Sequence, residues 1–279
     1  MNNVANCLYG AMIGDIAGSR FEWNATKHKT GYALFDSECC YTDDTAMTIA
    51  IARALMASGR DTERFESLAV QELRDVGQRF PHAGYGGSFR RWLKNPNPEP
   101  YNSWGNGSAM RVSSCGYAAR TLDEALQLAE ASARVTHNHP EGIKGAQATA
   151  AAIYLARTGA DKDAIGDYVE TTFEYDLHRT LNDIRPGYAF DVSCQGSVPE
   201  SIICFLESDS YEDTLRNAIS LGGDSDTMAA IGGSIAWAFY LGGKDLAEGP
   251  EADLASQADL FLPQEFIQTA RQFDEFCLA

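Results

Sequence analysis

Two short acidic segments carry the side chains with the clearest capacity for chemistry. Residues 41–45 read Tyr-Thr-Asp-Asp-Thr, and residues 222–227 read Gly-Gly-Asp-Ser-Asp-Thr. Each segment comes directly before an apolar stretch that is expected to form a buried helix. A single carboxylate or hydroxyl can cap a helix and complement its dipole, so capping is the simpler interpretation of either segment alone. Each segment nevertheless offers two carboxylates and threonine hydroxyls, which is more than a cap requires.

Taken together, the two segments predict a site for metal ions. If they face each other, four carboxylates meet, and like charges about 4 Å apart repel by roughly 4 kcal/mol per pair at an effective dielectric near 20. Either some of these groups stay protonated or cations neutralise them. Two divalent cations would balance the charge, and oxygen ligands favour hard cations, Mg²⁺ first with Mn²⁺ or Ca²⁺ as alternatives. Zinc would require histidine or cysteine, which both segments lack.

The composition narrows the classes of partner. The formal net charge is −17, with 39 acidic and 22 basic residues, and no basic run offsets it. Such a surface repels phosphate backbones and argues against nucleic acid, whereas a small anionic substrate could still bind at a metal. Seven cysteines without a CxxC spacing indicate reduced thiols. Without a signal peptide or a long apolar run, the sequence predicts a cytoplasmic monomer that does not enter membranes.

The elements that would position these residues are mostly helices. Apolar periodicity and capping signals predict one all-α domain over residues 1–279, with at most a short strand or extended loop at 188–193. Gly232 and Gly233 cost helix propensity and indicate close packing against another helix. The helices are expected over residues 45–58, 63–80, 122–135, 140–157, 163–173, 202–206, 211–221, 227–241 and 263–276.

Six segments of the chain resemble the ADP-ribosylglycohydrolase family. They read GAMIGDIAGSRFE at residues 10–22, YTDDT at 41–45, GYGGSFRRW at 84–92, GNGSAMR at 105–111, THNHPEGIKGA at 136–146 and SLGGDSDTMAAIGG at 220–233. The paired TDDT and GGDxDT motifs are highly specific. The resemblance implies a compact, orthogonal all-α domain with a binuclear metal site in a central cleft. It also implies hydrolysis that releases ADP-ribose from a protein side chain or a small acceptor.

The resemblance also implies roles for individual residues. Asp44 or Glu22 would act as acid or base, although Glu22 could instead gate the metals. Ser225 departs from the usual threonine but keeps the hydroxyl, and Asp15 is expected to be structural. The implied metal ligands are Thr42, Asp43, Asp44, Asp224, Asp226 and Thr227, and the implied substrate contacts are Gly86, Gly87, Ser88, Asn106, Gly107 and His137.

The sequence alone leaves several functions and acceptors open. A metal-dependent hydrolase of phosphoesters or phosphoanhydrides would use compatible chemistry. A relative that binds ADP-ribose without turning it over is the third alternative, although such a relative should have lost acidic ligands first. The acceptor could be arginine, serine, a DNA base or an acetyl ester. Near the glycine-rich loop, Arg90 and Arg91 are expected to form surface ion pairs rather than to contact diphosphate.

Overall fold

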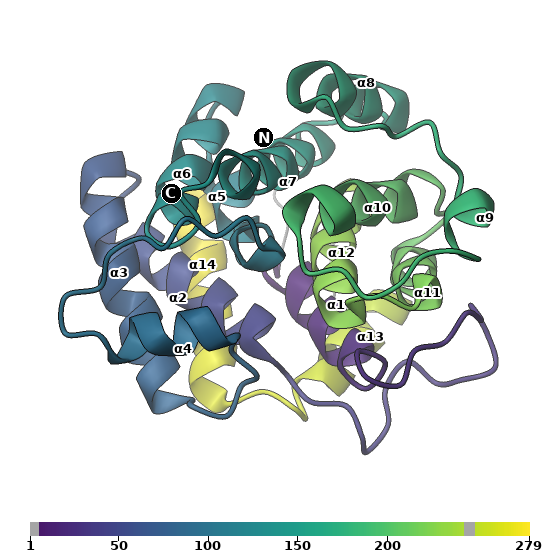
Figure 1. Ribbon diagram of the computed structural model, residues 1–279, viewed down its shortest axis with the longest axis horizontal. Coiled ribbons are helices and arrows are strands. Elements are labelled where there is room, and N and C mark those ends of the chain that lie inside the picture. The colour runs from purple at the N-terminus through teal and green to yellow at the C-terminus, as the bar shows by residue number, and fades with distance from the viewer. Residues whose placement is uncertain (1–5, 243–248) are drawn as a thin grey trace.

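Helices form all of the regular secondary structure in the described part of the chain. The computed structural model describes residues 6–242 and 249–279, in which there are fourteen α-helices, one short 3₁₀ helix and no strand. The helices run in several directions around one shared hydrophobic core (Figure 1). The expected single all-α domain is therefore confirmed. Among these residues no helix combines the length and the apolar character that a membrane span requires.

The helices follow one another along the described chain, and the longest connections come after the first and the fourth. Their bounds are α1 (Tyr9–Ser19), α2 (Asp43–Ser58), α3 (Thr62–Arg79), α4 (Gly87–Lys94), η1 (Asn106–Ser108), α5 (Ser113–Ala118), α6 (Leu122–Arg134), α7 (Pro140–Arg157), α8 (Lys162–Phe173), α9 (Leu181–Ile184), α10 (Cys194–Leu206), α11 (Tyr211–Leu221), α12 (Ser225–Leu241), α13 (Pro250–Ala258) and α14 (Gln264–Leu278).

Each expected helix has a counterpart in the structure, with differences at the ends, and the structure adds helices that were not predicted, α4, α5 and α9 among them. Helices α2 and α12 begin inside the acidic segments, so the carboxylates occupy their first turns. Helix α10 begins at Cys194 rather than at Ile202 and includes Pro199, with Ser193 accepting a hydrogen bond from the Gly196 N–H as its cap. Residues 188–193 form an extended loop, which pairs with the rest of the described chain through one isolated bridge between Gly105 and Ser193.

Helices α1 and α12 cross at the centre of the domain because glycines let their backbones touch (Figure 1). A Cβ atom on Gly10 would lie 2.9 Å from the Gly233 carbonyl oxygen, and one on Gly14 would lie 2.2 Å from that of Ala229. Further along α1, a Cβ on Gly18 would meet the backbone at Ser225. The two helices are thus antiparallel, and the end of α1 lies beside the start of α12. The close helix packing expected from the glycine pair of α12 is observed.

The same helix α1 also fixes the start of α2. Asp15 is fully buried, and its carboxylate accepts hydrogen bonds from the Thr42 N–H at 2.9 Å, the Thr42 hydroxyl at 2.7 Å and the Thr45 N–H at 3.1 Å. These bonds satisfy backbone donors that the first turn of a helix leaves free. Asp15 therefore has the structural role expected of it, and α1 brings the first turns of α2 and α12 to one place.

Candidate metal centre and substrate cleft

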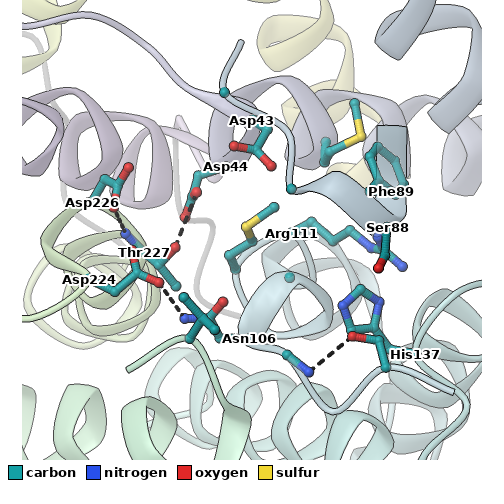
Figure 2. Close-up of a pocket in the computed structure, with 18 of the residues that line it drawn as sticks. Asp43, Asp44, Ser88, Phe89, Asn106, Arg111, His137, Asp224, Asp226 and Thr227 are labelled. Carbon is teal, nitrogen blue, oxygen red and sulfur yellow. Dashed lines mark hydrogen bonds between the residues drawn. The ribbon is translucent and has the colours of Figure 1, made fainter. Parts of the chain in front are cut away.

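The two acidic segments meet at the centre of the domain. The Thr227 hydroxyl donates to Asp44 Oδ2 at 3.2 Å, although the two residues are 183 positions apart in the chain (Figure 2). Carboxylate oxygens from both segments gather in two groups, within each of which the oxygens lie within 4.8 Å of one another. One group contains Asp15, Asp44 and Asp226, and the other contains Glu22, Asp224 and Asp226.

Burial makes this concentration of negative charge costly without a counterion. Asp44, Asp224 and Asp226 are each no more than 5% exposed. Burial, followed by the charges of neighbouring carboxylates, raises the pKa of Asp44 and of Asp226 well above the ordinary value. Burial and the charge of Asp15 raise the pKa of Asp43 to about 7. The carboxylates therefore either hold protons or require cations.

The hydrogen bonds around the centre leave ligand atoms free, which fits hard cations. Asp44 Oδ1 is buried and has no hydrogen-bond partner. Asp224 stands at the N-cap position of α12, but its side chain makes no capping bond. Capping therefore does not account for these carboxylates, whereas Thr42 does cap α2 by accepting from the Asp44 N–H. A set of buried carboxylate and hydroxyl oxygens is suited to Mg²⁺, Mn²⁺ or Ca²⁺.

Asn106 supports the centre from the opposite wall. Its Nδ2 donates to Asp224 Oδ2 at 2.7 Å and approaches the Ser197 hydroxyl at 3.3 Å. The Asn106 N–H donates to the Val192 carbonyl at 2.8 Å, which fixes the 3₁₀ turn η1 against the 188–193 loop. This amide holds one Asp224 oxygen in place.

Glu22 follows α1 and lies beside the start of α12. Its side chain is about half buried and lines the cleft. Burial, together with the charge of Asp224, raises the pKa of Glu22 to about 7, while a hydrogen bond with Trp23 acts in the opposite direction. Glu22 is therefore a carboxyl group that can carry a proton near neutral pH.

A cleft of about 440 Å³ extends from the carboxylates to the glycine-rich loop before α4. The carboxylates stand at one end, and Ser88, Phe89 and His137 stand at the other (Figure 2). The lining consists of Glu22, Trp23, Asp43, Asp44, Met47, Gly84, Gly86, Gly87, Ser88, Phe89, Tyr101, Ser103, Gly105, Asn106, Gly107, Met110, Arg111, His137, Phe190, Val192, Asp224, Asp226 and Thr227. All proposed site residues except Thr42 are in this lining.

His137 and Arg111 form the far wall of the cleft. Burial and the charge of Arg111 lower the pKa of His137 well below its ordinary value, so the ring is neutral. Its Nδ1 lies 2.7 Å from the Thr136 hydroxyl, and its other side faces Gly107, where a Cβ would lie 3.1 Å from Nε2. Arg111 donates to the Ser132 carbonyl and the Thr136 hydroxyl, and burial lowers its pKa to about 10.

The glycine-rich loop presents backbone rather than charge to the cleft. Gly86 is the N-cap of α4 and has no side chain to occupy the first N–H groups of the helix. Free N–H groups at a helix start attract anions, as does the helix dipole. Gly84 adopts φ +101°, and a Cβ there would lie 3.2 Å from Asp43 Oδ1, so this position requires glycine. The loop thereby connects the carboxylate end of the cleft to the start of α4.

The structure differs from the sequence-based expectations at Thr42 and at the two arginines that follow the glycine-rich loop. Thr42 is outside the lining, and its hydroxyl is engaged with Asp15 and with the N–H of Asp44. The expected surface ion pairs of Arg90 and Arg91 are wrong, since neither forms one within residues 6–242 and 249–279. Arg91 instead donates to the Ser88 hydroxyl at 2.9 Å.

Several lining residues were not identified from the sequence, among them Phe190 and Val192. These two lie in a loop without a motif, and nothing in their local sequence marks them as part of a site. Trp23 also lines the cleft. It is 80% exposed at the mouth of the cleft, which makes it a wall.

Removal of divalent cations is expected to destabilise the protein more at pH 7.5 than at pH 5. Unfolded aspartate ionises near pH 4, whereas Asp43 in the fold ionises at about 7. The metal-free fold therefore binds more protons than the unfolded chain and loses stability as pH rises through this window. Bound cations would prevent this loss of stability, because they neutralise the ionised carboxylates. Calorimetry with EDTA or Mg²⁺ should show a Tm difference of about 5 °C at pH 7.5. An equal difference at both pH values would contradict this account.

The family model and the curated relatives that match this chain agree on one family. The sequence model described as ADP-ribosylglycohydrolase matches residues 1–249. ADP-ribosylhydrolase ARH3 of Bos taurus is 27% identical over 86% of this chain and 85% of the relative, and the Homo sapiens protein of the same name is also 27% identical, over 86% of each chain.

A bacterial relative and a solved structure cover nearly the whole chain. ADP-ribosylarginine hydrolase Tri1 of Pseudomonas putida (strain GB-1) is 25% identical over 99% of this chain and 80% of its own length. The solved structure titled ADP-ribosylglycohydrolase-related protein complex superposes with a TM-score of 0.65 over 98% of both chains at 22% identity. At that identity the structural likeness supports the fold alone.

Proposed function

The chain belongs to the ADP-ribosylglycohydrolase family, and from this premise we propose that it is a metal-dependent hydrolase that releases ADP-ribose from a protein side chain or a small acceptor. The observation that carries the proposal is the meeting of buried carboxylates from α2 and α12 at one end of a 440 Å³ cleft. The cleft is large enough for an elongated nucleotide-like ligand.

We assign the whole of residues 1–279 to one domain of this family. Beyond the matched region, α14 packs against α2, where Arg53 pairs with Glu265 at 2.9 Å. Asp274 of the same helix accepts hydrogen bonds from the N–H groups of Asn6 and Cys7, each at 2.8 Å, in front of α1. These contacts make α14 a part of the same core.

The residues that would hold two divalent cations are Asp43, Asp44, Asp224, Asp226 and Thr227, with Thr42 as a further candidate that would have to exchange its bond with Asp15. When bound, such cations stabilise developing negative charge, orient vicinal hydroxyls and make water more acidic. Oxygen ligands suit Mg²⁺, Mn²⁺ and Ca²⁺ alike, and we propose Mg²⁺ as the first candidate.

The protein's own groups supply the rest of the reaction. Cleavage of a glycosidic bond requires a proton for the leaving group and an activated water. We assign the proton to Glu22, whose carboxyl is half buried beside Asp224 and has a pKa of about 7. Asp44 is the alternative acid or base, and its unpartnered Oδ1 can accept a proton from water.

The far end of the cleft would bind the diphosphate and the adenosine. Backbone N–H groups of Gly86, Gly87 and Ser88 can hold phosphate oxygens without adding charge to an acidic protein. Gly107 allows close approach beside His137, whose neutral ring can donate or accept a hydrogen bond. Asn106 also lines the cleft, so we keep it as a substrate contact in addition to its bond with Asp224.

Product analysis tests the proposal. The protein is incubated with ADP-ribosylated arginine, serine and O-acetyl conjugates, with and without Mg²⁺ or Mn²⁺. Intact ADP-ribose formed only with metal supports the proposal. Release of AMP would instead support hydrolysis of the phosphoanhydride. Binding of ADP-ribose with no turnover of any conjugate would support a non-catalytic relative.

Replacing Asn106 with alanine is expected to lower kcat/KM by about 10- to 100-fold, the range seen when a partner that orients a metal ligand is removed. The variant loses the 2.7 Å bond to Asp224. Titration with Mn²⁺ should show a parallel loss of affinity. The matched control is Ser197→Ala, which removes the weaker 3.3 Å contact and leaves the Asp224 bond in place. Equal loss in both variants would contradict the assigned role.

A further inference from the structure

A second cavity borders the glycine-rich loop outside the cleft. Its volume is about 580 Å³, which is within the range of small-molecule sites. Gly84 is the one residue that its lining shares with the lining of the cleft. We call this cavity the α3–α4 pocket, and its lining consists of Gly77, Gln78, Pro81, His82, Gly84, Tyr85, Arg90, Leu93 and Lys94.

Helices α3 and α4 build the walls of the α3–α4 pocket. Arg90, Leu93 and Lys94 are three and four positions apart on α4, so they lie on one face of that helix. Gly77 lets this face approach α3, since a Cβ there would lie 2.7 Å from Leu93 Cδ2. Gln78 Nε2 donates to the Leu93 carbonyl at 3.3 Å. The end of α3 is thereby tied to the end of α4, and the pocket has a fixed floor.

The polar groups of this lining are basic or neutral. Arg90 and Lys94 carry full positive charges, His82 adds an imidazole, and the lining contains no carboxylate. All three side chains are exposed, and none forms an ion pair with any residue that the structure describes. On a chain with a net charge of −17, such a pocket is a local positive site.

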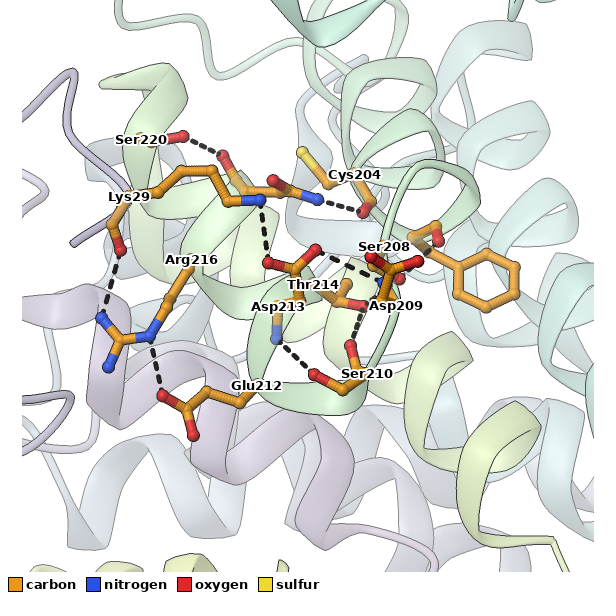
Figure 3. Close-up of polar contacts among 12 residues, drawn as sticks. Lys29, Cys204, Ser208, Asp209, Ser210, Glu212, Asp213, Thr214, Arg216 and Ser220 are labelled. Atoms are coloured by element: carbon orange, nitrogen blue, oxygen red, sulfur yellow. Dashed lines mark hydrogen bonds and ion pairs between the residues drawn. The ribbon is translucent and has the colours of Figure 1, made fainter.

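Other cations of this acidic protein do have carboxylate partners. On α11, Arg216 donates to Glu212 at 2.7 Å, and the Lys29 ammonium pairs with Asp213 at 2.8 Å (Figure 3). Arg134 of α6 pairs with Glu66 at 2.6 Å. The basic side chains of the α3–α4 pocket therefore differ from these in leaving their charges uncompensated.

Helix stability does not account for both charges of α4. Lys94 is in the last turn, where a cation complements the helix dipole. Arg90 is in the first half of the same helix, where the dipole does not favour a cation. The two residues are four positions apart, so their like charges repel each other across one helical turn. A bound anion would remove this repulsion.

Tyr85 adds a donor and an apolar surface to the pocket. It is 2% exposed, and its buried hydroxyl has no hydrogen-bond partner among the described residues. Buried hydroxyls normally have a partner, so an acceptor from outside the chain is expected. The ring packs against Phe89 with centroids 5.5 Å apart. Pro81 and Leu93 extend the apolar part of the lining.

We propose that the α3–α4 pocket is a second anion site, outside the cleft, that binds a small organic phosphate. A phosphate monoester carries close to two negative charges at pH 7, which match the charges of Arg90 and Lys94. Its oxygens can accept from a guanidinium, an ammonium and a hydroxyl at once. The volume and the apolar part of the lining fit a phosphate with a ring attached, and they exceed what inorganic phosphate alone would fill.

Pyridoxal 5′-phosphate tests the pocket, because its aldehyde reacts with a lysine beside which the phosphate is held. The aldehyde and the Lys94 amine form an imine with loss of water, and borohydride reduces the imine to a stable amine that mass spectrometry quantifies. We expect Lys94 to be labelled at least about tenfold faster by pyridoxal 5′-phosphate than by pyridoxal, which lacks the phosphate. Lys29, which pairs with Asp213, should react equally with both aldehydes.

Two variants separate the pocket from the overall charge. Arg90→Gln should remove the difference between the two aldehydes at Lys94. Arg134→Gln is the matched control, because it removes the same charge from a surface residue outside the pocket and should keep the difference. Equal labelling of wild-type Lys94 by both aldehydes, or the same result in both variants, would overturn the inference.

Protection by unreactive compounds tests the class of ligand. Phenyl phosphate should slow the labelling of Lys94, phenol should not, and inorganic phosphate should slow it less because it lacks a ring. Protection by phenol as strong as that by phenyl phosphate would show that the phosphate is not recognised. Equal protection by inorganic phosphate would refute the preference for an organic phosphate. None of these measurements requires release of ADP-ribose, so their outcome is separate from that of the proposed function.

Discussion

Replacing Asp44 with asparagine is expected to lower kcat/KM for ADP-ribose release by at least about 10³-fold, which is about 4 kcal/mol of transition-state stabilisation. Asp44 is 3% exposed, accepts from Thr227 and belongs to the carboxylate group with Asp15 and Asp226. Its Oδ1 has no protein partner and is therefore free for a cation. The amide keeps the shape of the side chain but removes the charge that a cation requires.

Steady-state kinetics and Mn²⁺ titration measure this effect, and circular dichroism checks the fold. The metal-free variant should be at least as stable as the metal-free wild type, since one of several mutually repelling carboxylates is gone. Asp75→Asn is the matched control, because Asp75 is exposed on α3 and pairs with Arg79 on the surface. Wild-type turnover by Asp44→Asn would refute its assignment as a metal ligand.

Replacing Gly14 with alanine is expected to lower the free energy of unfolding by about 3 kcal/mol. Helix propensity alone favours alanine over glycine by about 1 kcal/mol, so the local effect has the opposite sign. The added Cβ would lie 2.2 Å from the Ala229 carbonyl oxygen and 2.4 Å from its carbon. Both are backbone atoms of α12, so α1 and α12 must separate, and the acidic first turn of α12 moves with them.

Urea unfolding followed by circular dichroism gives the free energy, and Mn²⁺ binding reports on the centre. Gly187→Ala is the matched control, since a Cβ at that position has no atom within 4 Å. We expect the control to change stability by less than about 0.5 kcal/mol. A Gly14→Ala protein that is more stable than wild type would show that propensity outweighs the contact.

Much of the helical fold could be predicted from local patterns. Thr121 caps α6, and Pro140 stands in the first turn of α7, as expected from their residue types. The two acidic segments were identifiable because each placed more carboxylates before an apolar helix than a cap needs. Their meeting was a hypothesis based on the expected burial of both helices, and the contact between Thr227 and Asp44 confirms it.

Other features depend on contacts that no local pattern encodes. Helix α10 continues through Pro199 because it is buried among neighbouring helices, which outweighs the local tendency of proline to interrupt a helix. The hydroxyl of Thr42 turned to Asp15, a residue of another helix, rather than into the cleft. Trp23 and Phe190 lie in loops far apart in sequence, and only the folded chain brings their rings together.

The 183 positions between Asp44 and Thr227 have a consequence for biosynthesis. While the chain is growing on the ribosome, its first acidic segment emerges early and has no partner. The second half of the centre emerges only when most of the polypeptide has been translated. A nascent or prematurely terminated chain that ends before α12 therefore lacks half of the carboxylates of the centre, and under the proposed function it could not release ADP-ribose.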